Sequence, residues 1–156
     1  PGKVQLGDPP GGPSTEDWVV LVENANVVRF GTGYPTRSGR IPGLLTEESP
    51  WIGTPAWDVE VVDADPGQVV FLGASLWTEA VPKPLGMGLA SVLPLAPNAP
   101  WLQAAVADSS GTAEFAIPMT SDPTWNGVSL FLQSYIFDPA TSGGWALSQG
   151  INGRLH

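Results

Sequence analysis

Residues 124–139 read TWNGVSLFLQSYIFDP, and this stretch decides the fold. An Asn-Gly turn signal precedes ten residues, 128–137, that are rich in β-branched, aromatic and aliphatic side chains, and Asp138-Pro139 ends the run. Successive side chains of a strand point to opposite faces, and here both faces are largely apolar, so neither is suited to full contact with water. We therefore predict a central strand of a β-sandwich, with one face on the core and the other partly covered.

The composition supports the same fold class. The 156 residues suit one domain, and 42% hydrophobic against 13% charged residues excludes disorder through excess charge. The 19 glycines and 17 prolines are dispersed between apolar runs, as expected for short strands joined by tight turns, and no window has the period of a substantial helix. We predict an all-β, antiparallel β-sandwich of jelly-roll or immunoglobulin-like type in residues 17–156, behind an extended N-terminal arm, residues 1–16.

Charge and cysteine content exclude several classes of function. A net charge of -9 argues against nucleic-acid binding and against docking on anionic membranes. No apolar run reaches about 18 residues, so we expect no insertion into a membrane. The sequence contains no cysteine, which excludes thiol catalysis and cysteine-ligated metals.

Alternation predicts which side chains of the neighbouring strands face the core. Residues 57–63 alternate cleanly, with Asp58 and Glu60 expected toward water. A turn signal at 65–67 then predicts a hairpin with residues 68–75, and a second hairpin is predicted between 102–107 and 112–117. The side chains expected to face the core from these strands are Trp57, Val59, Val61, Ala113, Phe115 and Ile117.

Other elements are predicted from local signals. Asp122-Pro123 is typical of a helix start and predicts one helical turn before the central strand. Residues 80–100 contain five prolines and are predicted to form a long connection with a short strand near 89–93. Residues 145–155 are predicted to form the last strand.

Four pieces of the sequence match a known family in order. They are Phe30-Gly31-Thr32-Gly33-x-Pro35, then Ile52-Gly53, then Ile117-Pro118 with Asp122-Pro123, and finally 127–133 leading through Asp138-Pro139 to 146–150. Over about residues 30–151 the chain resembles a C-terminal-type β-sandwich domain of uncharacterised secreted proteins of environmental bacteria. The resemblance implies an extracellular or cell-surface protein and carries no assigned activity or site. Members commonly have a cysteine where this chain has Tyr34, so the disulfide suggested by that position is absent.

The residues offer little for an enzyme, and we expect none. The only histidine is His156, the last residue, which makes a Ser-His-Asp arrangement improbable. Asp58 and Glu60 share a face, but it is the solvent face of an alternating strand, which explains them without hydrolysis. No cofactor is expected. The turn Asp63-Ala64-Asp65-Pro66-Gly67 partly resembles a calcium loop and leaves Ca²⁺ as an alternative, although turn chemistry explains its aspartates more simply.

Seven tryptophans are many for a chain of this length. Trp18 and Trp57 are expected in the core. Trp51 and Trp101 directly follow prolines, and these two and Trp77 are expected in loops. The three are the candidates for exposure, either for contact with a polysaccharide or for contact with protein.

The leading hypothesis is a non-enzymatic extracellular structural subunit that self-assembles into a homo-oligomer, filament or surface polymer. Residues 1–16 are rich in Gly and Pro, and 17–23 (DWVVLVE) form a strong apolar strand pattern. Such a region can add a strand to the exposed sheet edge of a neighbour. The residues expected at this interface are Val4, Leu6, Trp18, Val20 and Val22. The alternative functions are a carbohydrate-binding module that uses exposed tryptophans and a passive, monomeric domain.

Overall fold

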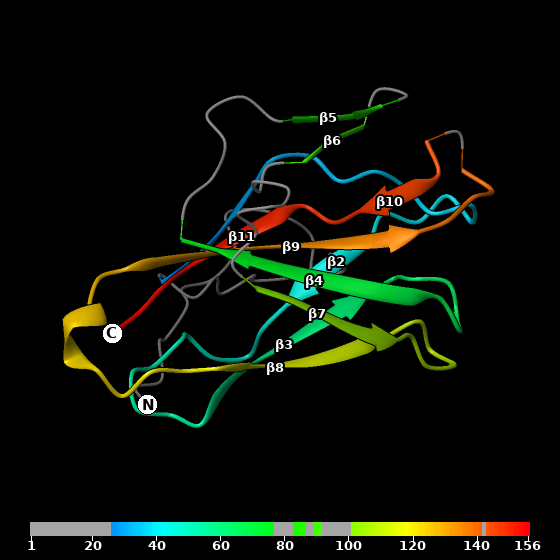
Figure 1. Cartoon of the computed structure of the whole chain (residues 1–156). Helices are drawn as coiled ribbons and strands as arrows, with labels where there is room; N and C mark the ends of the chain where they lie inside the picture. Colours follow the sequence, from blue (N-terminus) through cyan, green and yellow to red (C-terminus); the bar gives the residue numbers. More distant parts are fainter. Residues whose placement is uncertain (1–25, 77–82, 87–88, 92–100, 142) are drawn as a thin grey trace, which may run out of the picture.

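The computed structural model describes residues 26–76, 83–86, 89–91, 101–141 and 143–156, and in this part the chain is an antiparallel β-sandwich (Figure 1). Sheet A has the order β1-β11-β9-β4-β7, with β10 also paired to β9, and sheet B has the order β2-β3-β8. The short strands β5 and β6 pair with each other.

The strand bounds of sheet A are β1 Val27–Phe30, β4 Val69–Ser75, β7 Trp101–Val106, β9 Ser129–Phe137, β10 Trp145–Leu147 and β11 Gly150–Arg154. Those of the others are β2 Gly43–Leu45, β3 Ala56–Val62, β8 Ala113–Pro118, β5 Lys83–Gly86 and β6 Leu89–Ser91.

The predicted fold class is therefore confirmed. One 3-10 turn, η1 (Pro123–Trp125), precedes β9, and the Asp122 side chain accepts a hydrogen bond from the Thr124 amide, as the helix-start signal predicted. None of the helices described is long and apolar enough to cross a membrane. The predicted arm, residues 1–16, and the strand pattern at 17–23 lie outside the described residues.

The central strand is β9, as its two apolar faces predicted. It pairs with β11 and β10 along one side and with β4 along the other. Leu132 and Ile136 are fully buried in the core between the sheets. On the opposite face Tyr135 is buried, whereas Phe137 is 54% exposed. One face of β9 is thus on the core and the other is partly covered.

The core lies between the inner faces of the two sheets. All six side chains that alternation assigned to it from β3 and β8 are buried, and Val70 and Leu72 of β4 pack opposite them. The indole N–H of Trp57 donates to Thr46 Oγ1 (2.7 Å) and to the carbonyl oxygen of Glu48 (2.8 Å), so the buried ring keeps its polar atom satisfied.

A second, smaller apolar cluster covers part of the outer face of sheet A. Tyr135 and Leu147 are buried there, with Tyr34, Phe71 and Trp145 packed against them. Tyr34 and Leu147 exchange two backbone hydrogen bonds, N to O at 2.8 Å and 3.1 Å. This backbone bridge holds the loop that carries Tyr34 against β10.

The last predicted strand is two strands rather than one. β10 and β11 are separated at Ser148, whose hydroxyl accepts a hydrogen bond from the Ser134 amide (2.9 Å). Both strands nevertheless run beside β9, so the sheet continues across the break.

Both predicted hairpins are wrong in their pairing, although their strands exist. β3 pairs with β2 and β8 in sheet B, whereas β4 pairs with β9 and β7 in sheet A. β7 and β8 are likewise divided between the two sheets. Each expected turn is an arch that carries the chain from one sheet to the other. Alternation shows which side chains face the core, but two strands facing each other across the core alternate in the same way as two strands side by side.

The two arches are hydrogen-bonded to each other. The Ala64 amide donates to the carbonyl oxygen of Gly111 (3.1 Å), the Gly67 amide donates to that of Ala107 (2.9 Å), and the Ala107 amide donates to that of Gln68 (2.9 Å). Ala64 and Ala107 are buried, which leaves no room for larger side chains at this junction. The arches therefore close one end of the sandwich as a unit.

Gly111 is required at this junction for two reasons. Its φ of 84° lies in the left-handed region that disfavours residues with a Cβ atom. A Cβ atom added there would also collide with the carbonyl oxygen of Ala64, which is backbone and has little freedom to move.

We predict that Gly111→Ala destabilises the fold by roughly 2–5 kcal/mol, because about 1–2 kcal/mol of backbone strain adds to about 1–3 kcal/mol of steric overpacking. Gly53 is the matched control, since its φ is 86° and nothing lies within 4 Å of a Cβ atom placed there. Gly53→Ala should lose only the strain, about 1–2 kcal/mol. Urea unfolding of both variants tests this, and equal losses would show that the contact with Ala64 carries no cost.

Candidate functional site

Only one of the three tryptophans proposed for ligand contact has a described side chain. Trp51 is 49% exposed, and its ring meets the His156 imidazole at a centroid separation of 3.7 Å with an interplanar angle of 61°. Trp101 opens β7 but its side chain lies outside the description, and Trp77 lies outside it altogether. In the described part, Trp51 is therefore a single exposed indole rather than part of a platform.

The five residues predicted at the assembly interface lie outside the described residues as well. A sheet edge of the kind that an added strand could join does lie within them, at β7, and is described below. That surface is made by residues that the sequence reasoning assigned to a hairpin instead.

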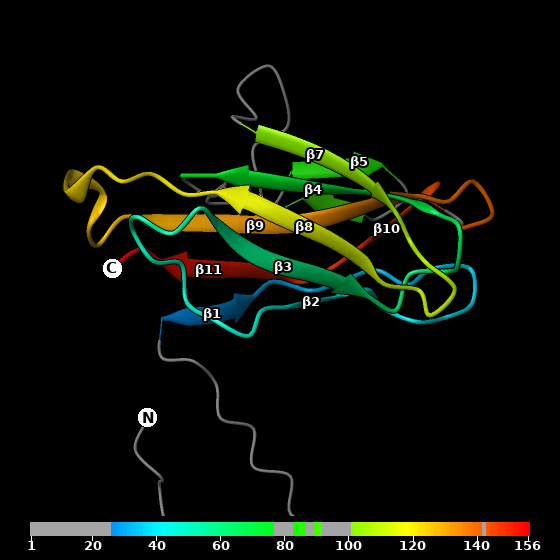
Figure 2. The same ribbon diagram turned by 90° about the horizontal axis from the view of Figure 1, so that it is seen from below.

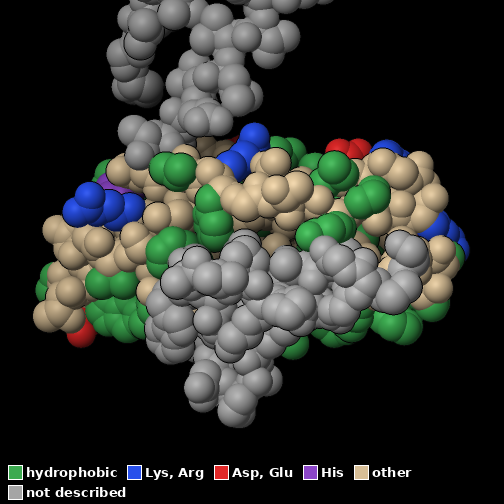
Figure 3. All heavy atoms as spheres, turned by 90° about the horizontal axis from the view of Figure 1, so that it is seen from above, with side chains coloured by type: hydrophobic (Ala, Val, Ile, Leu, Met, Phe, Trp, Pro, Cys, Tyr) green, Lys and Arg blue, Asp and Glu red, His purple; other side chains and the backbone are tan. Residues whose placement is uncertain are grey.

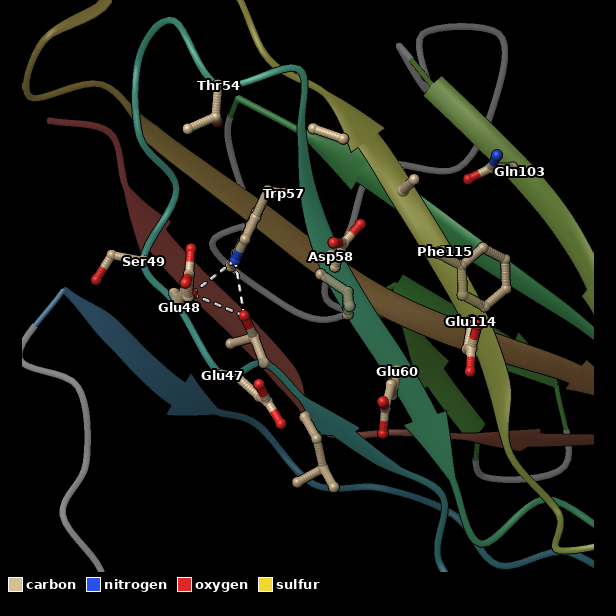
Figure 4. Close-up of a pocket in the computed structure, with 15 residues that line it drawn as sticks. Glu47, Glu48, Ser49, Thr54, Trp57, Asp58, Glu60, Gln103, Glu114 and Phe115 are labelled. Carbon is tan, nitrogen blue, oxygen red and sulfur yellow. Dashed lines mark hydrogen bonds between the residues drawn. The ribbon is translucent and has the colours of Figure 1, made fainter.

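An acidic hollow covers the outer face of sheet B (Figure 4). Its volume is about 1000 Å³, and its carboxylates come from β3, β8 and the segment after β2: Glu47, Glu48, Asp58, Glu60 and Glu114. Glu60 and Glu114 are direct partners across β3 and β8. All five residues are exposed, and none of them forms an ion pair with another described residue. They form a solvated acidic face, as expected for Asp58 and Glu60.

The turn that resembled a calcium loop is bound by arginines. Arg37 Nε lies 3.4 Å from Asp65 Oδ2, and the Arg40 guanidinium lies 3.8 Å from Asp65 Oδ1 and 3.9 Å from Asp63 Oδ1. Asp65 is buried, so these cations compensate its charge where water cannot. Among the described residues no group of three acidic or histidine side chains is placed to hold a metal ion.

Asp138 directly follows the central strand and, like Asp65, contacts Arg37. Burial favours the neutral acid and raises its pKa, but hydrogen bonds outweigh that effect. The Arg37 amide donates to Oδ2 (3.0 Å), the Ala140 amide donates to Oδ1 (3.1 Å), and the Gln68 side chain adds a third bond. The pKa of Asp138 is therefore lowered from its ordinary value.

We predict that Asp138→Ala costs about 1–3 kcal/mol at pH 7, because the amides of Arg37 and Ala140 lose a charged acceptor in part-buried hydrogen bonds. A lowered folded-state pKa stabilises the fold above the unfolded pKa, near 3.9, and that stabilisation is lost as pH falls through the folded value. The difference from the unmodified chain should therefore shrink between pH 5 and pH 3 in urea unfolding. Asp58→Ala, at an exposed site, is the control and should change stability by less than about 0.5 kcal/mol at either pH. A cost that does not depend on pH would contradict the role given to the carboxylate charge.

The edge of sheet A at β7 is the most open apolar feature described. Leu102 and Val106 are 61% and 62% exposed, and Ala104 between them is exposed too. Their partners on β4 include Phe71, which packs in the outer cluster, so these side chains lie on the outer face of sheet A. Figure 3 views the molecule from the side of this sheet and shows hydrophobic side chains scattered among polar ones where no grey atoms lie in front.

Among the described strands, only β4 pairs with β7. The Ala107 amide donates to Gln68 at the start of β4, so alternation turns the odd-numbered residues of β7 toward β4. The N–H and C=O groups of Leu102, Ala104 and Val106 therefore point away from the sheet. No other described strand pairs with this side.

The other three margins of the two main sheets carry features that discourage pairing. On β1, the Arg29 guanidinium reaches the carbonyl oxygen of Leu44 (3.5 Å) and links the two sheets. β2 is three residues long and follows Pro42. β8 carries Glu114 and ends in Pro118. Short strands, charges and prolines are the ordinary protection of edge strands. β7 also follows a proline, Pro100, but its own six residues, WLQAAV, contain neither a charge nor a proline.

Comparison with protein-family models, with curated proteins and with solved structures gave no match to this chain. The resemblance to a family of secreted proteins therefore stays a prediction.

Proposed function

We propose that the protein is a non-enzymatic structural subunit of the cell exterior that joins to copies of itself by strand addition. The N-terminal region of one copy, which contains Val4, Leu6, Trp18, Val20 and Val22, supplies the strand. A free sheet edge of the next copy accepts it. Backbone hydrogen bonds make the join, and alternate side chains set the register.

The observation that carries this proposal is the unprotected edge of β7. A strand with free amides and carbonyls and exposed apolar side chains is a template for another strand. The exposed Leu102 and Val106 lose contact with water when that strand is added, which favours association at about 25 cal/mol per Å² of apolar area covered. The exposure of the five carboxylates in the acidic hollow adds support, since hydrolysis needs paired carboxyl groups in a desolvated setting.

Removal of residues 1–23 is predicted to give a monomer by multi-angle light scattering, whereas the full chain forms larger species. The physical reason is that the shortened chain keeps its acceptor edge but has no strand to donate. Thermal unfolding should remain cooperative, which shows that the sandwich is intact. Strand donation is contradicted by an intact shortened chain with an unchanged mass distribution, or by a full chain that is monomeric at all concentrations.

A carbohydrate-binding module is the second candidate, and the exposed indole of Trp51 favours it. Stacking of a sugar ring on this indole predicts that the full chain is retained by insoluble polysaccharides such as cellulose or chitin, and that Trp51→Ala loses most of that retention. Trp57→Phe is the control, because that indole is buried. Absence of retention of the unmodified chain on a broad glycan panel would end this candidate.

A further inference from the structure

The sheet margins and the reach of the N-terminal region together select one pairing, which rests on the proposed function. We propose that β7 of one copy receives residues 17–23 of a neighbouring copy as an added antiparallel strand. Every neighbouring pair of strands in sheet A is antiparallel, so the added strand continues the existing ladder.

Residues 17–23 cannot reach β7 of their own chain. They join sheet A through β1, which begins at Val27. β1 and β7 lie at opposite margins of the sheet, with β11, β9 and β4 between them (Figure 2). A strand beyond β7 is five strand spacings from β1, about 24 Å at about 4.8 Å each. The four residues from Glu23 to Val27 span at most about 14 Å. If residues 17–23 cover β7, they must therefore do so in a second copy.

The side-chain pattern of residues 17–23 matches the two faces of β7. One parity, Trp18, Val20 and Val22, is wholly apolar, whereas the other begins at Asp17 and ends at Glu23. The outer face of β7 carries the exposed apolar side chains and needs the apolar parity beside it.

The register follows from this assignment. With Val20 opposite Ala104, an antiparallel strand places Trp18 beside Val106 and Val22 beside Leu102. Asp17 and Glu23, the two ends of the donor strand, then lie on the same face of the sheet as the exposed Gln103. Large donor side chains thus flank the small central alanine of the acceptor.

This contact is head-to-tail. The donor leaves from the β1 margin and the acceptor lies at the β7 margin, so each copy uses two different surfaces. Such contacts propagate as a filament unless the rotation per subunit closes a ring.

The acceptor edge is tested with two alanines in matched settings. Ala104 on β7 and Ala116 on β8 are both exposed and lie near the middle of an edge strand. Their amides point away from the sheet, because alternation places them opposite in direction to the amides of Ala107 and Met119. Those two amides donate inward, to the carbonyl oxygens of Gln68 and Pro55. Ala104→Pro removes an amide that only the added strand uses. We expect it to raise the concentration for half-assembly at least about tenfold, and Ala116→Pro to change it less than about twofold.

An equal effect of the two prolines, or a larger effect at Ala116, would overturn the assignment of β7. If thermal unfolding shows that Ala104→Pro is misfolded, Ala104→Lys and Ala116→Lys replace the pair under the same criterion, since a lysine charge protects an edge without removing an amide.

The donor segment is tested in the full chain with Val20→Pro and Leu6→Pro. We expect Val20→Pro to abolish assembly and Leu6→Pro to leave it unchanged. The reverse result overturns this inference while the proposed function stands, because the donor then lies nearer the N-terminus. Assembly that survives both prolines and also the loss of residues 1–23 overturns the inference and the proposed function together.

The register is tested by cross-linking, for which a chain without cysteine is well suited. Val20→Cys and Ala104→Cys are made in separate full-length chains, mixed and oxidised. A disulfide-linked pair containing one copy of each variant is expected, and Val20→Cys mixed with Ala116→Cys is the control. Cross-linking only in the control mixture would exclude β7 as the acceptor.

Discussion

The hydrogen bonds between the two arches are the constraint on which the rest of the structure depends. Ala64, Gly67 and Ala107 tie the β3–β4 crossing to the β7–β8 crossing, and Gly111 allows the approach. Since both crossings lie at one end, β4 and β7 enter sheet A side by side while β3 and β8 enter sheet B side by side. The pairing of four strands thus follows from a junction of a few backbone atoms.

The same junction creates the free edge. β7 pairs with β4 and is the last strand of sheet A, and the chain crosses to sheet B directly after it. β8 arrives at a margin too, but Glu114 and Pro118 make it a poor template for a further strand. The architecture is therefore asymmetric, with one receptive margin at β7 and the N-terminal region attached at the other, next to β1.

The sequence was informative wherever a property belongs to a single strand. The two apolar faces of β9 and the alternation of β3 and β8 predicted burial correctly, because the side-chain period of a strand is fixed by its backbone. Pairing depends on neighbours far away in the chain, and both predicted hairpins failed for that reason. The engagement of Asp65 by Arg37 and Arg40 also joins distant segments. The edge at β7 was hidden by its assignment to a hairpin, although a run of six residues without charge, Pro or Gly was a visible signal.

Glu60 and Glu114 stand opposite each other on the outer face of sheet B, among other carboxylates without ion pairs. In the proposed head-to-tail polymer this face would repeat at every subunit and make the polymer a polyanion. Two such polymers would repel each other at separations up to the Debye length, about 8 Å at physiological ionic strength. Growth along the axis would then be separated from bundling across it, and salt or divalent cations would control lateral association.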